Sequence, residues 1–541
     1  MISRLLSSES KSITGAAIII SAAGLLSDIA GVIRDRILAH NFGAGPVMDS
    51  YYAAFKVPDL IYNLLIVGAL TAGFIPTFTK IFYRNNNDRA NAWQLVNNLI
   101  NIAGILLIIL CGLGIIFTPV LTKIIAPGFS ETNLAMATSF ARIMFLSPLI
   151  LGISMVMGGV LQSLRQFVLY SIAPIFYNLG IIIGATLLIH TPLGLLGLPV
   201  GVILGALFHA GIQIYGAYQS GYRWKWFLNF KDKDTLLIGK LMIPRTMGVA
   251  ITQLNTVVIT IMASLLPIGS VAVYNYANNL QSVPTGLIGI PFALAVFPFL
   301  SQMVGEKNGE GFIKHLAATT RQILFFIIPV SLVTLLLRAQ IVRVILGSGA
   351  FDWNATIATA DALAFFSLGL FAQSLIPLYA RAFYALSNTK TPFTLGVIAE
   401  LIAIIAALLL MKPLGVAGLA LASSIGVILN LGMLVIALRQ LTGNLEETKM
   451  LHLLFRLAIA GLAMAVVIQT LKYPLSNILN LNRFWGILLH GGISGTVGLL
   501  VYGGICYLFK VEEMMTFHAS LKNRLFSFKN IPAGIDETKT I

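Results

Sequence analysis

Long apolar runs, broken at short intervals by polar loops, extend along nearly the whole chain. A membrane-spanning helix needs about 20 consecutive apolar residues, and runs of this length occur about 14 times. The pattern predicts an all-α polytopic membrane protein. The predicted spans are residues 14–33, 50–82, 93–122, 134–163, 168–190, 195–219, 239–265, 269–303, 318–346, 357–385, 391–411, 414–439, 452–472 and 484–509.

Composition supports this class, since 57% of the 541 residues are hydrophobic and only 10% are charged. Soluble domains carry roughly 25% charged residues. The net charge of +15 does not indicate nucleic-acid binding, because Lys and Arg gather in alternate loops. The connections around Thr191 and Pro267 contain neither residue type. Because basic loops stay on the cytoplasmic side of a membrane, both termini are predicted to be cytoplasmic.

The second and eighth predicted spans are unusually long and contain internal prolines. Pro58 and Pro76 interrupt the second span, and Pro284 and Pro298 interrupt the eighth. Bent or broken helices of this kind are tolerated in a membrane where they line a polar cavity. Both spans are therefore predicted to border such a cavity.

An internal repeat is visible in the sequence. The segment PLGLLGLPVGVILGALFHAGIQI begins at Pro192 and PLGVAGLALASSIGVILNLGMLV begins at Pro413, a shift of 413 − 192 = 221 residues. A second match aligns KVPDL with SVPTG and places Pro58 opposite Pro284. Two matches in the same order predict two pseudo-symmetric six-helix lobes followed by two further helices. The predicted domains are residues 1–225 and 226–445 for the lobes, 446–510 for the two extra helices, and 511–541 for a polar cytoplasmic tail.

Charged residues are concentrated within or at the ends of the first two predicted spans. A charge near the bilayer centre costs about 2.5–3.5 kcal/mol, and such residues commonly mark the path of a polar substrate. The guanidinium of Arg34 is suited to bidentate binding of a pyrophosphate. Pairing with Asp35, or extension to the membrane interface, is the alternative for this arginine. The charged residues are Asp28, Arg34, Asp35, Arg36, Asp49, Lys56 and Asp59.

Two predicted spans carry polar stripes at helical spacing. Residues three and four positions apart share one face of a helix, so each stripe is predicted to line a cavity. The alternatives are mutual pairing of Lys56 with Asp59 on the second span and interhelical hydrogen bonds on the eighth. The stripes are Asp49, Tyr52, Lys56, Asp59 and Asn63 on the second span, and Asn275, Asn278, Asn279 and Ser282 on the eighth.

Several stretches of the sequence are similar to motifs of one transporter family. GVIRDRILAHNFGAG, followed by MDSYYAAFKVPDL and GALTAGFIPTF, resembles the opening of the MurJ-type lipid II flippases. VPTGLIGIPFALAVFPFLS, LGSGAFDWNAT and ARAFYALSNTKTPF resemble later segments of that family. The family belongs to the multidrug/oligosaccharidyl-lipid/polysaccharide exporter superfamily. The resemblance covers essentially the whole chain and implies export of lipid II, the lipid-linked peptidoglycan precursor, across the bacterial plasma membrane.

The resemblance also implies roles for single residues. Arg34 matches the cavity arginine of the family's GxxRD element, and Asp49 matches an acidic position. The last two helices, within residues 446–510, resemble a groove for the polyprenyl tail. At other positions this chain departs from the family, and either it binds pyrophosphate with fewer charges or its substrate differs. Asp28, Tyr62 and Asn279 stand where the family carries arginines, Val67 where it carries glutamate, and Ile259 where a sodium site would need an acid.

These observations predict a transporter that binds the anionic head group of a lipid-linked glycan, together with membrane lipids, as a monomer. No cofactor or metal is expected, because Cys111 and Cys506 lie in apolar runs without metal-ligand spacing. Glu400, a lone acid in the eleventh predicted span, is a candidate site for ion coupling. The predicted substrate-binding residues are Arg34, Lys56, Asp35, Asp49, Asp59, Asn278 and Asn279.

Two other function classes stay open. A cation-coupled drug exporter or a polysaccharide-repeat flippase of the same superfamily would need a coupling acid, for which Glu400 is again the candidate. A membrane enzyme is disfavoured, because the sequence contains no HExxH or GxSxG motif and no large polar loop.

Overall fold

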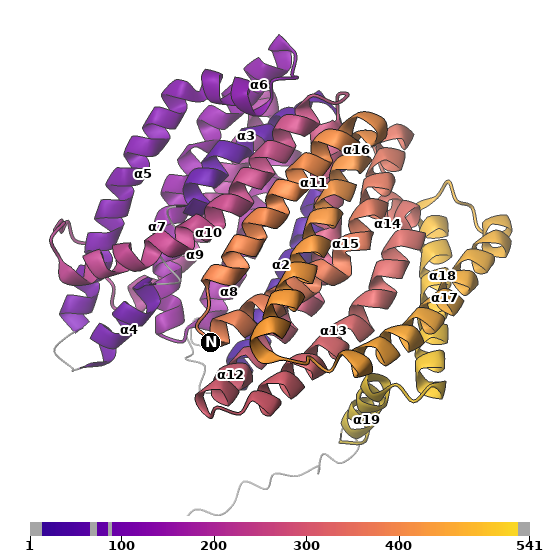
Figure 1. Ribbon diagram of the computed structural model, residues 1–541. Coiled ribbons are helices and arrows are strands. Elements are labelled where there is room, and N and C mark those ends of the chain that lie inside the picture. Colours follow the sequence, from indigo (N-terminus) through magenta and orange to yellow (C-terminus); the bar gives the residue numbers. More distant parts are fainter. Residues whose placement is uncertain (1–12, 65–72, 85–88, 528–541) are drawn as a thin grey trace, which may run out of the picture. The chain divides into compact units, whose positions relative to one another are not determined.

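The computed structural model describes residues 13–64, 73–84 and 89–527, and every regular element in this part of the chain is a helix. Coiled ribbons appear throughout Figure 1. Ten of the described helices are long and apolar enough to cross a membrane, which confirms an all-α, multi-pass class. The total of about 14 spans stays a prediction that follows from the lengths of the apolar runs.

The helices follow one another with short connections. In chain order they are α2 (Ile13–Phe42), α3 (Pro46–Tyr62), α4 (Ile75–Arg84), α5 (Arg89–Ile125), α6 (Glu131–Met144), α7 (Leu146–Ser163), α8 (Phe167–Thr186), the short η3 (Leu188–His190) and η4 (Gly194–Leu196), α9 (Gly197–Gln219), α10 (Lys233–Ser264), α11 (Ser270–Pro284), η5 (Thr285–Gly289), α12 (Ile290–Gly305), α13 (Gly309–Leu336), α14 (Arg338–Ile345), α15 (Trp353–Ala385), α16 (Lys390–Thr442), α17 (Glu447–Ile478), α18 (Phe484–Leu508) and α19 (Glu512–Ser527).

The helices group into two compact units, and each is made of several separate stretches of chain. The first unit comprises Met1–Val283, Ile341–Gly369 and Lys390–Asn430. The second comprises Pro284–Gln340, Leu370–Thr389 and Leu431–Ile541. The lobe boundaries at 225/226 and 445/446 stay predictions from the sequence repeat.

Within the first unit, α8 and α9 pack backbone against backbone through glycines. A Cβ added to Gly180 would lie 2.1 Å from the nitrogen of Gly205, and one added to Gly184 would lie 2.6 Å from the Cα of Gly201. On each helix the two glycines are four residues apart, the small-xxx-small spacing that lets transmembrane helices approach closely. Gly201 and Gly205, which lie in the first repeat segment, therefore form the α9 side of this contact.

The glycine of the PLG motif has a positive φ in both copies of the repeat. Gly194 has a φ of 52° and Gly415 has a φ of 58°, a left-handed conformation that favours glycine. The sequence predicted two helices with a break between residues 411 and 414. The structure has such a break one residue further on, because Gly415 has a non-helical backbone (φ 58°, ψ −136°) that separates two helices within Lys390–Thr442.

The second repeat match is also reflected in the backbone. Residues 63–64, directly after α3, and residues 73–74, directly before α4, have π-helical backbone. After α11 the five residues of η5 form a π-helix directly after Pro284. Proline deprives the helix of one N–H donor, and π turns of this kind often occur at functional sites.

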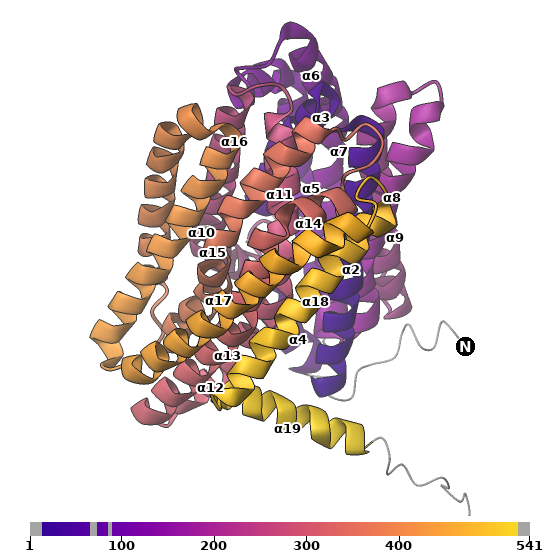
Figure 2. The same cartoon turned by 90° about the vertical axis from the view of Figure 1, so that its right-hand side faces the viewer.

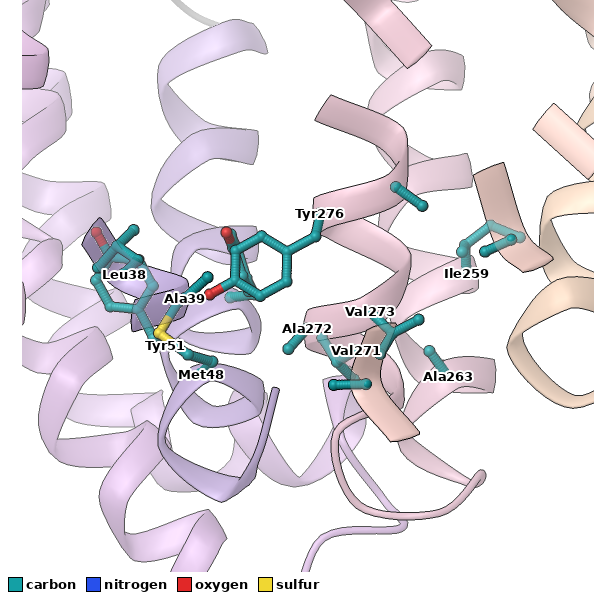
Figure 3. Close-up of a cluster of buried hydrophobic side chains, with 14 of the residues drawn as sticks. Leu38, Ala39, Met48, Tyr51, Ile259, Ala263, Val271, Ala272, Val273 and Tyr276 are labelled. Carbon is teal, nitrogen blue, oxygen red and sulfur yellow. The ribbon is translucent and has the colours of Figure 1, made fainter. Parts of the chain in front are cut away.

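Large buried side chains hold α11 against α2 and α3 in the first unit. Tyr276 extends from α11 toward Leu38, Met48 and Tyr51 (Figure 3). The Tyr276 hydroxyl donates to the backbone oxygen of Gly43 over 3.3 Å, so the ring is fixed at both ends. Aromatic rings bury large apolar areas, and these contacts position α11 beside the first two helices.

In the second unit, α17 and α18 lie side by side, and α19 turns away from the end of α18 (Figure 2). Arg321 on α13 is bonded to Glu446 and Glu513, each over 3.0 Å, and so connects three elements of this unit. The hydrogen bond from Lys449, together with Arg321, lowers the pKa of Glu446. The first part of the predicted tail is thus a helix that is anchored by an ion pair.

Replacement of Gly180 by alanine tests the close packing of α8 on α9. The added Cβ meets backbone atoms that cannot move independently, so we expect Gly180→Ala to destabilise the protein by about 1–3 kcal/mol. Gly211→Ala is the matched control on α9, because a Cβ there meets nothing within 4 Å. Thermal unfolding in detergent should show a lower midpoint for Gly180→Ala alone. Equal midpoints for the two variants would contradict this packing.

Candidate functional site

A cavity of about 390 Å³ lies inside the first unit. It is bordered by both charged and aromatic side chains, and no described part of α5 or α6 contributes to it. The lining residues come from α2, α3 and the turn after it, α7, α8, α9 and α11. They are Arg34, Leu38, Tyr51, Tyr52, Phe55, Lys56, Asp59, Tyr62, Asn63, Leu151, Pro174, Tyr177, Ile181, His209, Asn275 and Asn279.

Arg34 is held in the cavity wall by two partners. Its Nε and Nη2 donate to Oδ1 of Asp35 over 2.9 and 2.7 Å, and its Nη1 donates to Oδ1 of Asn178 over 3.0 Å. A guanidinium has five N–H donors, so two are left for a ligand. The side chain is 23% exposed, and its fixed orientation suits recognition of an anion.

Asp35 accepts hydrogen bonds on both of its carboxylate oxygens, with Oδ1 bonded to Arg34. Its Oδ2 accepts a hydrogen bond from Nδ2 of Asn279 over 2.8 Å. The residue is only 5% exposed, and a buried charge needs such partners to offset its lost hydration. Asp35 therefore connects α2 to α11 and sets the position of Arg34.

Lys56 supplies a second cation to the cavity. Its Nζ donates to Oδ1 of Asn275 over 3.3 Å, and Asp59, one helical turn further along α3, interacts with it electrostatically. An ammonium group has three donors, so this hydrogen bond uses only part of its capacity. The cavity thus combines Arg34 and Lys56 with a single lining carboxylate, that of Asp59.

The structure brings together some of the predicted site residues and separates others. Arg34, Lys56, Asp59 and Asn279 line the cavity, and Asp35 contacts two of them. Of the positions where arginine was expected from the family, Tyr62 and Asn279 face the cavity, whereas Asp28 is exposed elsewhere on α2. Val67 lies outside the described residues.

Three predicted residues lie apart from the cavity lining. Both carboxylate oxygens of Asp49 accept backbone N–H groups at the start of α11, from Gly269 over 2.6 Å and from Ala272 over 2.8 Å. Asn278 accepts a hydrogen bond from Gln281 on its own helix. Glu400 on α16 is partly buried and interacts electrostatically with Tyr274.

The fold brings several residues to the cavity that were not predicted from the sequence. Asn178 and His209 interrupt apolar runs, and a polar side chain within a membrane span is a signal that could have found them. Tyr51 and Tyr177 carry no such signal, because tyrosine is also common in ordinary membrane helices near the interface. Only the packing of α3 and α8 shows that these rings face the same space.

The carboxylate of Asp49 acts as a cap for the first turn of α11. Asp49→Ala would leave two buried N–H groups without acceptors, each of which costs about 1–3 kcal/mol, so we expect a clearly lower unfolding midpoint. Asp49→Asn retains one acceptor oxygen and should fall between the parent and the alanine variant. Glu131→Ala, which removes an exposed acid from α6, is the control. A midpoint for Asp49→Ala equal to that of the control would rule out the cap.

Comparison with known proteins gives consistent matches over nearly the full length. The family model described as "Lipid II flippase MurJ" matches residues 38–483. A "Probable lipid II flippase MurJ" of Vibrio cholerae is 28% identical, and the match covers 91% of this chain and 94% of the relative. A protein of the same name from Rhizobium tropici is 29% identical over 92% of this chain and 93% of the relative.

Solved structures give the same fold. The structure described as "Lipid II flippase MurJ, inward closed conformation" is 24% identical, with a TM-score of 0.76 over 91% of this chain and 98% of that chain. An inward-facing multidrug resistance MATE family transporter is 16% identical, with a TM-score of 0.65 over 80% of this chain and 99% of that chain. At these identities the two likenesses bear on the fold alone.

Proposed function

The chain belongs to the lipid II flippase MurJ family, and from this premise we propose that it moves lipid II across the bacterial plasma membrane. The precursor passes from the inner to the outer leaflet, which makes the protein a transporter in peptidoglycan biosynthesis and not an enzyme. Lipid II joins a polyprenyl tail to a glycan head group through a pyrophosphate. A membrane protein that moves it must shelter a charged group from the lipid interior.

The observation that carries this proposal is the cavity with Arg34 and Lys56 in its wall. The two unused N–H donors of Arg34 bind the pyrophosphate, and Lys56 adds a second positive charge. Charge-assisted hydrogen bonds from a fixed guanidinium are among the stronger polar contacts, and the fork of Arg matches two phosphate oxygens. Asp35 and Asn279 position the arginine, and Asp59 keeps Lys56 from binding the anion too tightly.

Movement of the head group follows an alternating-access scheme. We assign about 14 spans, as the run lengths predict, with two six-helix lobes at 1–225 and 226–445 and cytoplasmic termini. The similar positive φ angles of Gly194 and Gly415 support this internal repeat. The cavity opens first to the cytoplasm and then to the outside, and the differing affinities of the two states drive release. The helices of residues 446–510 hold the polyprenyl tail, and the protein acts as a monomer among membrane lipids.

The remaining predicted site residues have supporting roles in this scheme. Asn278 and Asp49 lie on or against α11, so they influence the substrate through the placement of that helix. Glu400 is the candidate group for ion coupling, since a partly buried acid can exchange a proton or a cation. A drug exporter or a polysaccharide-repeat flippase is the alternative, and the MATE likeness supports only the shared fold.

Arg34→Ala in a bacterium depleted of its own lipid II flippase tests the proposal. A charge-assisted hydrogen bond contributes about 1.5–3 kcal/mol, so the variant should bind the head group roughly 10- to 100-fold more weakly. We expect the parent to restore growth, and Arg34→Ala to leave the precursor on the inner side. Growth and precursor accumulation are measured for both at equal membrane abundance.

Arg142→Ala is the matched control, because Arg142 is an exposed cation on α6 outside the cavity. It should restore growth as the parent does. If the parent inserts into the membrane but does not restore growth, lipid II is not its substrate. If Arg34→Ala restores growth fully, the flippase function stands but Arg34 is not its central cation.

A further inference from the structure

We propose that the tyrosine wall of the cavity, formed by Tyr51, Tyr52 and Tyr177 together with His209, binds the sugar part of the head group. This inference rests on the proposed function and divides the cavity into two subsites. Arg34 and Lys56 take the pyrophosphate, whereas the tyrosine wall takes neutral hydroxyl and amide groups. The glycan would then be recognised by this chain and not merely carried along with the lipid.

The first observation is a pair of buried hydroxyls without partners. Tyr51 is 2% exposed and Tyr52 is 9% exposed, and both line the cavity. Among the described residues, neither phenolic oxygen has a hydrogen-bond partner. Buried polar groups are otherwise nearly always paired, so two adjacent exceptions at one cavity indicate that a ligand completes them.

The second observation is that the two rings are held rigidly. Tyr51 meets Phe55 edge-on with centroids 5.0 Å apart, and it meets Tyr52 at 5.7 Å. Tyr52 in turn packs edge-on against Tyr276 at 5.6 Å. The hydroxyl of Tyr276 is already bonded to backbone, so this ring serves as a support. Fixed hydroxyls lose little freedom when a ligand binds to them.

His209 adds a further polar group to the wall. Its Nδ1 is 2.7 Å from Oγ of Ser154, a buried contact that sets the orientation of the ring. Tyr177 approaches the imidazole edge-on with centroids 6.5 Å apart. Nε2 makes no hydrogen bond with any described residue, although His209 lines the cavity. Nδ1 therefore bonds to Ser154 within the protein, and Nε2 is available to a ligand.

The chemistry of these groups fits a sugar better than it fits a second anion. Phenolic hydroxyls both donate and accept, and an imidazole nitrogen does one or the other according to the tautomer, which suits sugar hydroxyls and amide substituents. Aromatic faces cover the apolar face of a sugar ring without adding charge. A pyrophosphate would instead select the cations, Arg34 on α2 and Lys56 about one turn beyond the two tyrosines of α3.

Binding of two probes to the purified full chain tests the division of the cavity. One probe is a polyprenyl pyrophosphate without sugar, and the other is lipid II with its glycan. Tyr51→Phe combined with Tyr52→Phe removes only two hydroxyls, so binding of lipid II should weaken about 10-fold. Binding of the sugar-free probe should not change. Tyr276→Phe is the matched control and should leave the ratio of the two affinities unaltered.

His209→Gln is a second variant on another helix and should also weaken only the glycan-bearing probe. Thermal unfolding confirms that each variant is folded before binding is compared. Equal weakening for both probes, or no weakening for either, would overturn the sugar subsite. Arg34→Ala should weaken both probes, which reports on the proposed function separately. If the parent binds neither probe, the proposed function fails and the sugar subsite fails with it.

Discussion

The ion pair between Arg34 and Asp35 is the interaction on which the cavity depends, because a charge inside an apolar bundle persists only when it is paired and hydrogen-bonded. Asn178 accepts a further hydrogen bond from the arginine, and Asn279 donates one to the carboxylate. These four side chains come from α2, α8 and α11. The hydrogen bonds among them hold the three helices around the cavity. The same bonds leave part of the guanidinium available for a ligand.

The rest of the first unit serves this arrangement. Gly180 and Gly201 let α8 and α9 approach closely, which places Tyr177 and His209 on the same wall. The cap that Asp49 provides for α11 fixes the position of this helix along its axis, and so the position of Asn279 relative to Asp35. Helices in lipid associate through close packing and hydrogen bonds, since lipid is as apolar as the side chains it replaces. Small residues and capped helix ends are therefore as important here as the charges.

The charges and the tyrosines divide the cavity between two kinds of chemistry. A single binding surface of cations would hold an anion strongly in every state and would oppose its release. A transporter needs an affinity for its substrate that changes between its states. Binding of the head group through several weaker neutral contacts allows this change. The pairing of Lys56 with Asn275 and its proximity to Asp59 moderate the positive charge in the same way.

The sequence by itself determined the class of this protein, because apolar runs of membrane-spanning length leave few other folds. It also identified Arg34, Lys56 and the glycine repeat, since charges in membrane spans and repeated glycines are visible in the order of residues. It offered Asp35 as a partner for Arg34, but it predicted that Asp49 lines the cavity. The tertiary structure placed Asp35 on an arginine and Asp49 on the backbone of α11. It also placed His209 and Tyr51 in the wall of one cavity, because contacts between helices depend on packing between distant parts of the chain and not on local pattern.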